Sequence, residues 1–175
     1  MKIQIRDLIK KFDLKVGDGK LYIEAFTHAS YRNENSLNFD YQRLEFLGDA
    51  VIQIIITEYL YKKNPEKNEG SLSKKRKEFV KGETLQKISK EISLLKCCYF
   101  GNGVDKNKDV EKVNEDIFES FIGAVYLSEG QNKTQKIINE TLIKYCIDNN
   151  ISEMNTDFKS QFQEKIQNIN FNHKE

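Results

Sequence analysis

Apolar residues along the chain recur at intervals of three and four more often than they alternate, a spacing typical of helices rather than strands. Short helices are predicted over residues 3–12 and 21–29. A long helix is predicted over 41–63 and is ended by Pro65, which cannot continue it. The Asn- and Ser-rich segment 31–38 before that helix is expected to be a loop. The pattern therefore predicts an all-α fold.

The second half of the chain continues the helical pattern. Ser71 is a suitable N-cap for a helix over 72–79, and Gly82 is expected to divide that helix from one over 83–92. The apolar segment 94–100 is too short for its pattern to indicate one type of secondary structure. After a polar loop, further helices are predicted over 110–128, over 134–147 and from 157 onward.

Two acidic residues stand out in the helix predicted over 41–63. Glu45 and Asp49 are one turn apart, and the row that they share continues into Ile52 and Ile56. We therefore expect neither acid to lie on a solvated face, because a helix that is apolar on almost all sides is normally buried. A buried carboxylate is costly unless a cation or a metal ion balances its charge.

The helix predicted over 110–128 repeats this design. Asp116 and Glu119 are three residues apart and therefore neighbours on one face. Gly48 and Gly123 stand beside the two acidic pairs, and such small residues would allow the two helices to approach closely. Four clustered carboxylates with no histidine or cysteine suit Mg²⁺ or Mn²⁺ rather than zinc. Two such ions could activate a water and stabilise the leaving oxygen of a phosphodiester.

Salt bridges offer an alternative explanation for these acids. Arg43 and Lys112 are close in sequence and could balance the carboxylates without a metal ion. We favour the metal site because two such pairs occur in two apolar helices. A helical scaffold with salt-bridged acids remains the plainer alternative.

Charge is distributed unevenly along the chain, although its net value is only +1. Residues 62–90 hold ten basic and four acidic side chains, which make a local basic patch. The densest part is a basic cluster formed by Lys74, Lys75, Arg76 and Lys77. Nucleic acid is therefore a candidate partner.

Other features bear on location. No apolar run is long enough to span a membrane, and the first residues contain no signal-peptide apolar segment. The three cysteines lack paired spacing, so we expect reduced thiols rather than disulfides or a zinc site. An intracellular location, cytoplasmic or nuclear, is expected, with no membrane partner.

Several segments together resemble a known family. Residues 41–50, Tyr-Gln-Arg-Leu-Glu-Phe-Leu-Gly-Asp-Ala, resemble the signature of the ribonuclease III catalytic domain, most closely in its Dicer-type form. Residues 26–31, 72–76 and 114–127 resemble further elements of that domain in the same order. The resemblance covers about residues 20–148.

This resemblance implies an all-α, homodimeric endonuclease domain over residues 1–154 that cleaves double-stranded RNA. By position, Glu45, Asp49, Asp116 and Glu119 match the catalytic carboxylates of the family, which bind two Mg²⁺ ions, or Mn²⁺, at each site. The products would carry 5′-phosphates and 3′-hydroxyls on short 3′ overhangs. The alternative is a catalytically inactive member that serves as a dimerisation and RNA-binding module of a larger assembly.

Other positions acquire expected roles in the same way. Phe46 matches the aromatic residue that contacts the partner subunit, with core packing as its alternative role. The basic cluster is expected to meet RNA phosphates. Gln42 stands where many bacterial members carry a further acid, so it could bind a metal-bound water or the RNA but is not a charged ligand. Ala29 replaces the usual arginine, and His28 is expected to be a hydrogen-bonding core residue.

The end of the chain forms a separate tail in this interpretation. Residues 155–175 resemble the opening helix of a double-stranded-RNA-binding domain. About twenty residues are too few to fold as that domain. We therefore expect a helical tail after the catalytic domain.

Overall fold

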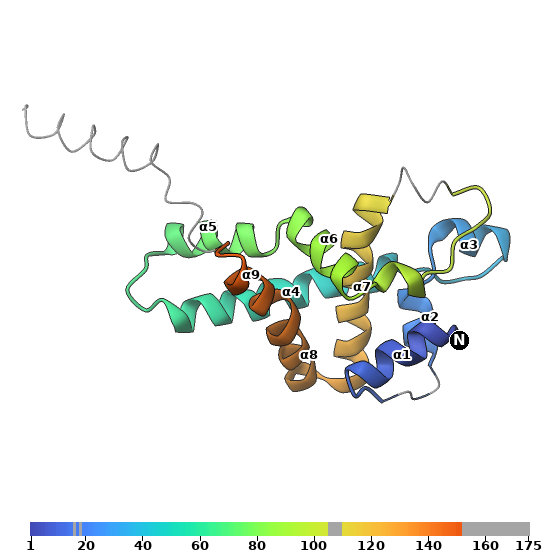
Figure 1. Cartoon of the computed structure of the whole chain (residues 1–175), viewed down its shortest axis with the longest axis horizontal. Helices are drawn as coiled ribbons and strands as arrows, with labels where there is room; N and C mark the ends of the chain where they lie inside the picture. Colours follow the sequence, from blue (N-terminus) through green and yellow to red (C-terminus); the bar gives the residue numbers. More distant parts are fainter. Residues whose placement is uncertain (16, 18, 105–109, 152–175) are drawn as a thin grey trace, which may run out of the picture.

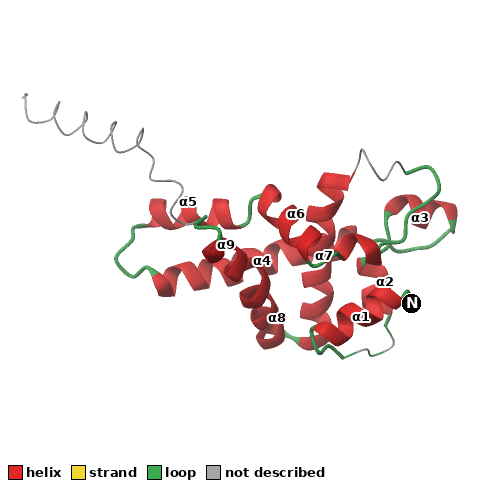
Figure 2. Ribbon diagram, in the orientation of Figure 1, coloured by secondary structure: helices red, strands yellow, loops and turns green. Residues whose placement is uncertain are grey.

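The structure is a computed structural model that describes residues 1–15, 17, 19–104 and 110–151. Figure 2 shows that these residues form helices joined by loops, which confirms the all-α prediction. The elements, in chain order, are α1 (Ile3–Lys11), α2 (Lys20–Ala25), α3 (Ala29–Glu34), α4 (Gln42–Lys63), α5 (Glu69–Phe79), α6 (Gly82–Glu91), the 3-10 turn η1 (Leu94–Cys97), α7 (Val110–Glu129), α8 (Gln131–Ile138), the π-helical turn η2 (Asn139–Ile143) and α9 (Lys144–Asp148).

Helices α4 and α7 cross at the centre of the molecule, and the other helices pack around this crossing (Figure 1). Both helices bury apolar side chains in one core, including Ile52 and Ile56 from α4 and Phe118 and Phe121 from α7. Helix α5 folds back along α4, while α2 packs against α7 (Figure 1). The two acid-bearing helices are therefore the core of the fold.

Two glycines allow the helices to touch through their backbones. A Cβ on Gly48 would stand 1.8 Å from the carbonyl oxygen of Glu119. A Cβ on Gly123 would stand 2.3 Å from the carbonyl oxygen of Leu44. Both distances are far inside van der Waals contact, so no side chain fits at either position. The expected close approach at the small residues is confirmed.

The segment predicted as a loop before α4 is partly helical. Residues Ala29–Glu34 form α3, because His28 acts as its N-cap and accepts a hydrogen bond at Nδ1 from the backbone N–H of Ser30 at 3.1 Å. The same nitrogen lies 2.7 Å from the Ser30 hydroxyl, and the His28 ring packs against those of Tyr41 and Phe100. His28 is thus the hydrogen-bonding residue that the sequence predicted, but the Asn-rich composition concealed its helix.

Other boundaries also differ from prediction. Helix α2 ends at Ala25, before the predicted end at residue 29, and α8 begins at Gln131, before the predicted start at residue 134. Helix α5 begins at Glu69, three residues early, because Asn68 rather than Ser71 provides the cap and its Oδ1 accepts a hydrogen bond from the Ser71 N–H at 2.9 Å. The ambiguous segment 94–100 forms η1 and then an extended bridge. In that bridge, Tyr99 N–H donates to the Phe26 carbonyl at 2.7 Å, and the Tyr99 carbonyl accepts from His28 N–H at 3.1 Å.

The helix predicted over 134–147 is present as α8, η2 and α9, with a π-helical turn in the middle. Cys97, Cys98 and Cys146 are buried free thiols, as expected. No helix in the described ranges combines the length and apolarity needed to cross a lipid bilayer. The predicted tail, residues 155–175, lies outside the described residues.

Candidate metal centre

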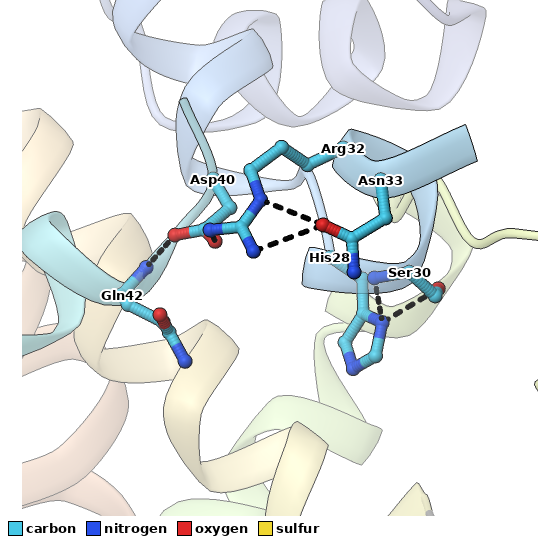
Figure 3. Close-up of polar contacts among 6 residues, drawn as sticks. All are labelled: His28, Ser30, Arg32, Asn33, Asp40 and Gln42. Carbon is cyan, nitrogen blue, oxygen red and sulfur yellow. Dashed lines mark hydrogen bonds and ion pairs between the residues drawn. The ribbon is translucent and has the colours of Figure 1, made fainter. Parts of the chain in front are cut away.

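The first turn of α4 is held in place from α3. Asp40 accepts a hydrogen bond at Oδ1 from the backbone N–H of Gln42 at 3.0 Å, and its Oδ2 lies 2.6 Å from Nη1 of Arg32 (Figure 3). Arg32 also donates to the side-chain oxygen of Asn33 (Figure 3). The helix that sequence reasoning missed therefore supplies the arginine that anchors the start of α4, one turn before Glu45.

Three of the four predicted carboxylates come together at the crossing of α4 and α7. One oxygen each of Glu45, Asp116 and Glu119 lies within 4.8 Å of the others. Asp116 is only 6% exposed. The Tyr41 hydroxyl donates to its Oδ2 at 3.2 Å, and Lys112 Nζ lies 3.1 Å from its Oδ1. Burial and the nearby Asp116 keep the pKa of Tyr41 far above its ordinary range, so this hydroxyl stays a donor.

The fourth carboxylate, Asp49, lies on the wall of a cavity of about 500 Å³ next to this group. The cavity is lined by Gln42, Glu45, Phe46, Asp49, Val80, Glu115 and Glu119. Asp49 is exposed and Glu45 is half-buried, so the expectation that neither lies on a solvated face is wrong for Asp49. The reason is that Gly48 presses on α7, which turns the neighbouring residue 49 out to the rim of the crossing.

The electrostatics of this group are repulsive. Burial raises the pKa of Glu119 to about 8, and the negative charges of Asp49, Glu115, Glu45 and Asp116 add to the effect. Burial and then Asp116 also raise the pKa of Glu45. The salt-bridge alternative holds in part, since Lys112 pairs with Asp116. One lysine is fewer than the remaining carboxylates, whose negative charges add to the effect of burial on the pKa of Glu119.

These residues fit a divalent metal ion. Oxygens on opposite sides of a six-coordinate Mg²⁺ are about 4.2 Å apart, twice the Mg–O distance. Three carboxylate oxygens within 4.8 Å of one another lie near this limit and would draw slightly closer together to share such an ion. The group holds only oxygen donors, which is the ligand type that Mg²⁺ and Mn²⁺ prefer.

The raised pKa of Glu119 predicts how stability changes with pH when no metal is present. Between its ordinary pKa of 4.5 and the folded value of about 8, the folded state holds a proton that the unfolded state has lost. The free energy of unfolding should therefore fall as pH rises through this window. Thermal melts in EDTA from pH 5 to 9 would measure the decline, and Glu119→Gln should flatten it.

A control variant makes that measurement specific. Glu111→Gln changes an exposed acid on the same helix, whose side chain is 80% exposed, and should keep the slope of the parent. Equal slopes for the parent and Glu119→Gln would contradict the assignment of the effect to Glu119.

Comparison with known proteins decides the family. A family model described as Ribonuclease-III-like matches residues 18–146. The chain belongs to the ribonuclease III family. Among curated relatives, Ribonuclease 3 of Mycoplasmoides gallisepticum is 42% identical over 167 residues, which is 95% of this chain and 25% of that protein. Ribonuclease 3 of Mesoplasma florum is 39% identical over 165 residues, covering 93% of this chain and 71% of that protein.

Solved structures of the ribonuclease III family agree. The nuclease domain of ribonuclease III from Campylobacter jejuni superposes with a TM-score of 0.72 at 29% identity, covering 81% of this chain and 97% of that one. Dicer from Pichia stipitis gives a TM-score of 0.57 at 28% identity, covering 81% of this chain and 60% of that one. The chain thus spans nearly all of a nuclease domain but only a quarter of the M. gallisepticum relative.

Two residues at this ribonuclease III site had no role in the sequence interpretation. Tyr41 belongs to the signature, yet only the structure shows its hydroxyl on Asp116. Glu115 precedes Asp116 in the acidic helix and lines the cavity. Sequence spacing could have found Glu115 as an acid beside Asp116, but it could not show which way the side chain faces.

The basic cluster on α5 is turned partly toward α4. Lys75 Nζ donates to Asn64 Oδ1 at 2.8 Å, and Arg76 Nη1 donates to Thr57 Oγ1 at 3.1 Å. Lys77 is exposed and Lys74 is half-buried. These bonds dock α5 on α4, so Lys75 and Arg76 have a structural role in addition to the predicted contact with RNA, which stays a prediction.

Proposed function

We propose that this chain is the catalytic domain of an endoribonuclease that cleaves double-stranded RNA with the help of divalent metal ions. The observation that carries the proposal is the group of Glu45, Asp116 and Glu119, whose oxygens lie within 4.8 Å of one another at the crossing of the two central helices. Family membership and relatives named Ribonuclease 3 support the same reaction.

The four predicted carboxylates have distinct places in this proposal. Glu45, Asp116 and Glu119 would hold one Mg²⁺ or Mn²⁺, and Asp49 would help to hold a second ion on the cavity side. Bound ions would supply activation of a water and stabilisation of the leaving oxygen. Tyr41 and Lys112 keep Asp116 oriented. Cleavage would leave 5′-phosphates and 3′-hydroxyls on short 3′ overhangs.

A homodimer is part of the proposal. Phe46 is 82% exposed, so its alternative role in core packing is wrong. Ile54 and Tyr61, also largely exposed, share its side of α4. A stripe of large apolar side chains in solvent marks an interaction surface. The structure from Campylobacter jejuni is described as having a region involved in dimer formation. Two copies of this chain would cover the stripe.

Phe46 gives a direct test of the dimer. Phe46→Ala removes the most exposed aromatic ring of the stripe and should convert the dimer to monomers at micromolar concentration, as measured by light scattering. Leu127→Ala on α7 is the matched control, since Leu127 is also an exposed apolar residue but lies on another helix. A monomeric parent, or a Phe46→Ala variant that stays dimeric, would contradict the proposal.

RNA binding in the proposal depends on charge rather than base sequence. The basic cluster would contact phosphates of an A-form duplex, so affinity should fall steeply with salt.

The proposed location is intracellular and not nuclear, because the curated relatives are bacterial. The inactive dimerisation module is disfavoured because all four carboxylates face the crossing or its cavity.

The decisive experiment uses a long end-labelled duplex RNA incubated with the protein in Mg²⁺ and, separately, in EDTA. Cleavage in Mg²⁺ alone, with staggered ends, is expected. Intact RNA in both samples would contradict the proposed activity and favour the binding module. Single-stranded RNA of the same sequence is the substrate control and should remain intact.

A further inference from the structure

Glu115 is a fifth acid at the metal centre. It lies on α7 one residue before Asp116, and its side chain lines the same cavity as Gln42, Asp49 and Glu119. It also adds to the charge felt by the other acids, since its carboxylate contributes to the raised pKa values of Glu45 and Glu119. Glu115 therefore faces the place where a second ion would lie.

Helix α6 holds the Glu115 carboxylate in position. A Cβ on Gly82, the first residue of α6, would stand 2.4 Å from Oε2 of Glu115, so the absence of a side chain there makes room for the carboxylate. Gln86, one turn later, donates from Nε2 to the same oxygen at 3.3 Å. A neighbouring element thus fixes Glu115 toward the cavity, instead of leaving it free on the surface.

Charge balance indicates what the fifth acid is for. In the part of the chain that the structure describes, five carboxylates surround the site, and Lys112 is the ammonium group that contacts them. Two divalent cations together with Lys112 would neutralise all five. A single divalent cation would leave two negative charges in a half-buried site, where unpaired charge is costly.

Gln42 faces the same cavity from α4 and is neutral. Residues 41–50 resemble the ribonuclease III signature, and many bacterial members carry an acid where this chain has Gln42. Position 42 of α4 therefore brings no charge to the cavity, whereas Glu115 of α7 brings one to the same lining.

We propose that Glu115 is a positioning residue for the second metal ion, supplying from α7 the negative charge that position 42 lacks on α4. The proposal rests on the metal-dependent function proposed above. Glu115 lies outside the group of three residues that would hold the first ion, so it would act on water molecules of the second ion rather than replace a ligand of the first.

The test is a titration of the purified chain with Mn²⁺, monitored by calorimetry and by the paramagnetic signal of free Mn²⁺. The parent is expected to bind two ions. Glu115→Gln should weaken the second ion at least about 10-fold, as loss of an outer-sphere partner does, and should leave the first within a factor of about 2. Gln42→Glu in the Glu115→Gln background should restore the second ion.

Controls separate this role from simple support of α6. Glu111→Gln, an exposed acid four residues earlier on α7, should bind both ions like the parent. If Glu115 only supports α6, Glu115→Gln should lower the melting temperature in EDTA, and Gln42→Glu should restore nothing. That result, or unchanged binding of two ions by Glu115→Gln, overturns the inference and leaves the proposed function standing. A parent that binds no Mn²⁺ overturns both.

Discussion

Replacement of Glu119 by glutamine is expected to reduce Mg²⁺-dependent cleavage of duplex RNA by at least about 100-fold while the fold survives, since loss even of an outer-shell partner costs 10- to 100-fold. Glutamine keeps the size of the side chain and removes the negative charge that would hold the ion. Glu119 is the most strongly perturbed acid of the group, with its pKa raised to about 8. Cleavage rates with end-labelled RNA would measure the effect.

Stability in EDTA should change in the opposite direction. Above pH 8 the ionised Glu119 is half-buried beside other carboxylates, so Glu119→Gln should raise the melting temperature of the metal-free protein. Asp49→Asn should also lose cleavage, with a smaller change in melting temperature because Asp49 is exposed. Glu111→Gln is the control that keeps parent activity. A folded Glu119→Gln variant that cleaves like the parent would refute the assigned role.

Replacement of Gly48 by alanine is expected to destabilise the fold by about 3 kcal/mol or more, at the upper end of overpacking effects. The new Cβ would stand 1.8 Å from the Glu119 carbonyl oxygen, and the obstructing atom is backbone rather than a mobile side chain. Helices α4 and α7 would have to separate, which would also move Glu45 away from Asp116 and Glu119. Urea denaturation would give the loss of stability, and Mn²⁺ titration the loss of the site.

A second glycine supplies the matched control for that variant. A Cβ on Gly103 would meet no atom within 4 Å, and the φ of this residue lies outside the left-handed region. Gly103→Ala should therefore leave both stability and Mn²⁺ binding close to those of the parent. A Gly48→Ala variant as stable as Gly103→Ala would show that the crossing can open without cost. Metal binding would then not depend on contact between the two backbones.

Most helices could be read from the sequence, but the existence of α3 and several boundaries could not. Helices α4 and α7 carry apolar residues at helical spacing on almost all sides, as buried helices do. Their extents were therefore predicted almost to the residue. Helix α3 was missed because its cap is a histidine side chain, His28, and its composition is that of a loop. The start of α5 was misplaced because Asn68 and Ser71 are both good caps, and the contacts of α5 with α4 favour the earlier one.

The sequence predicted the two pairs of carboxylates but not how the four side chains are arranged in one site. Spacing along one helix places Glu45 beside Asp49, and spacing along another places Asp116 beside Glu119. It does not reveal that Asp49 turns to the rim while Glu45 joins the α7 pair. Nor does it show that Tyr41 donates to Asp116, since the direction of a side chain depends on what the helix packs against.

By itself, the sequence determined the helical class, the family and the identity of the acids, because these follow from periodicity and from residue order, which are local properties of the chain. The tertiary structure alone decided which carboxylate oxygens come together, which acid faces solvent and that Glu115 joins the cavity. Those outcomes depend on how α4, α6 and α7 cross, and the crossing is set by the backbone contact at Gly48 and Gly123 and by the space left at Gly82. Such contacts join residues far apart in the chain, so no local pattern encodes them.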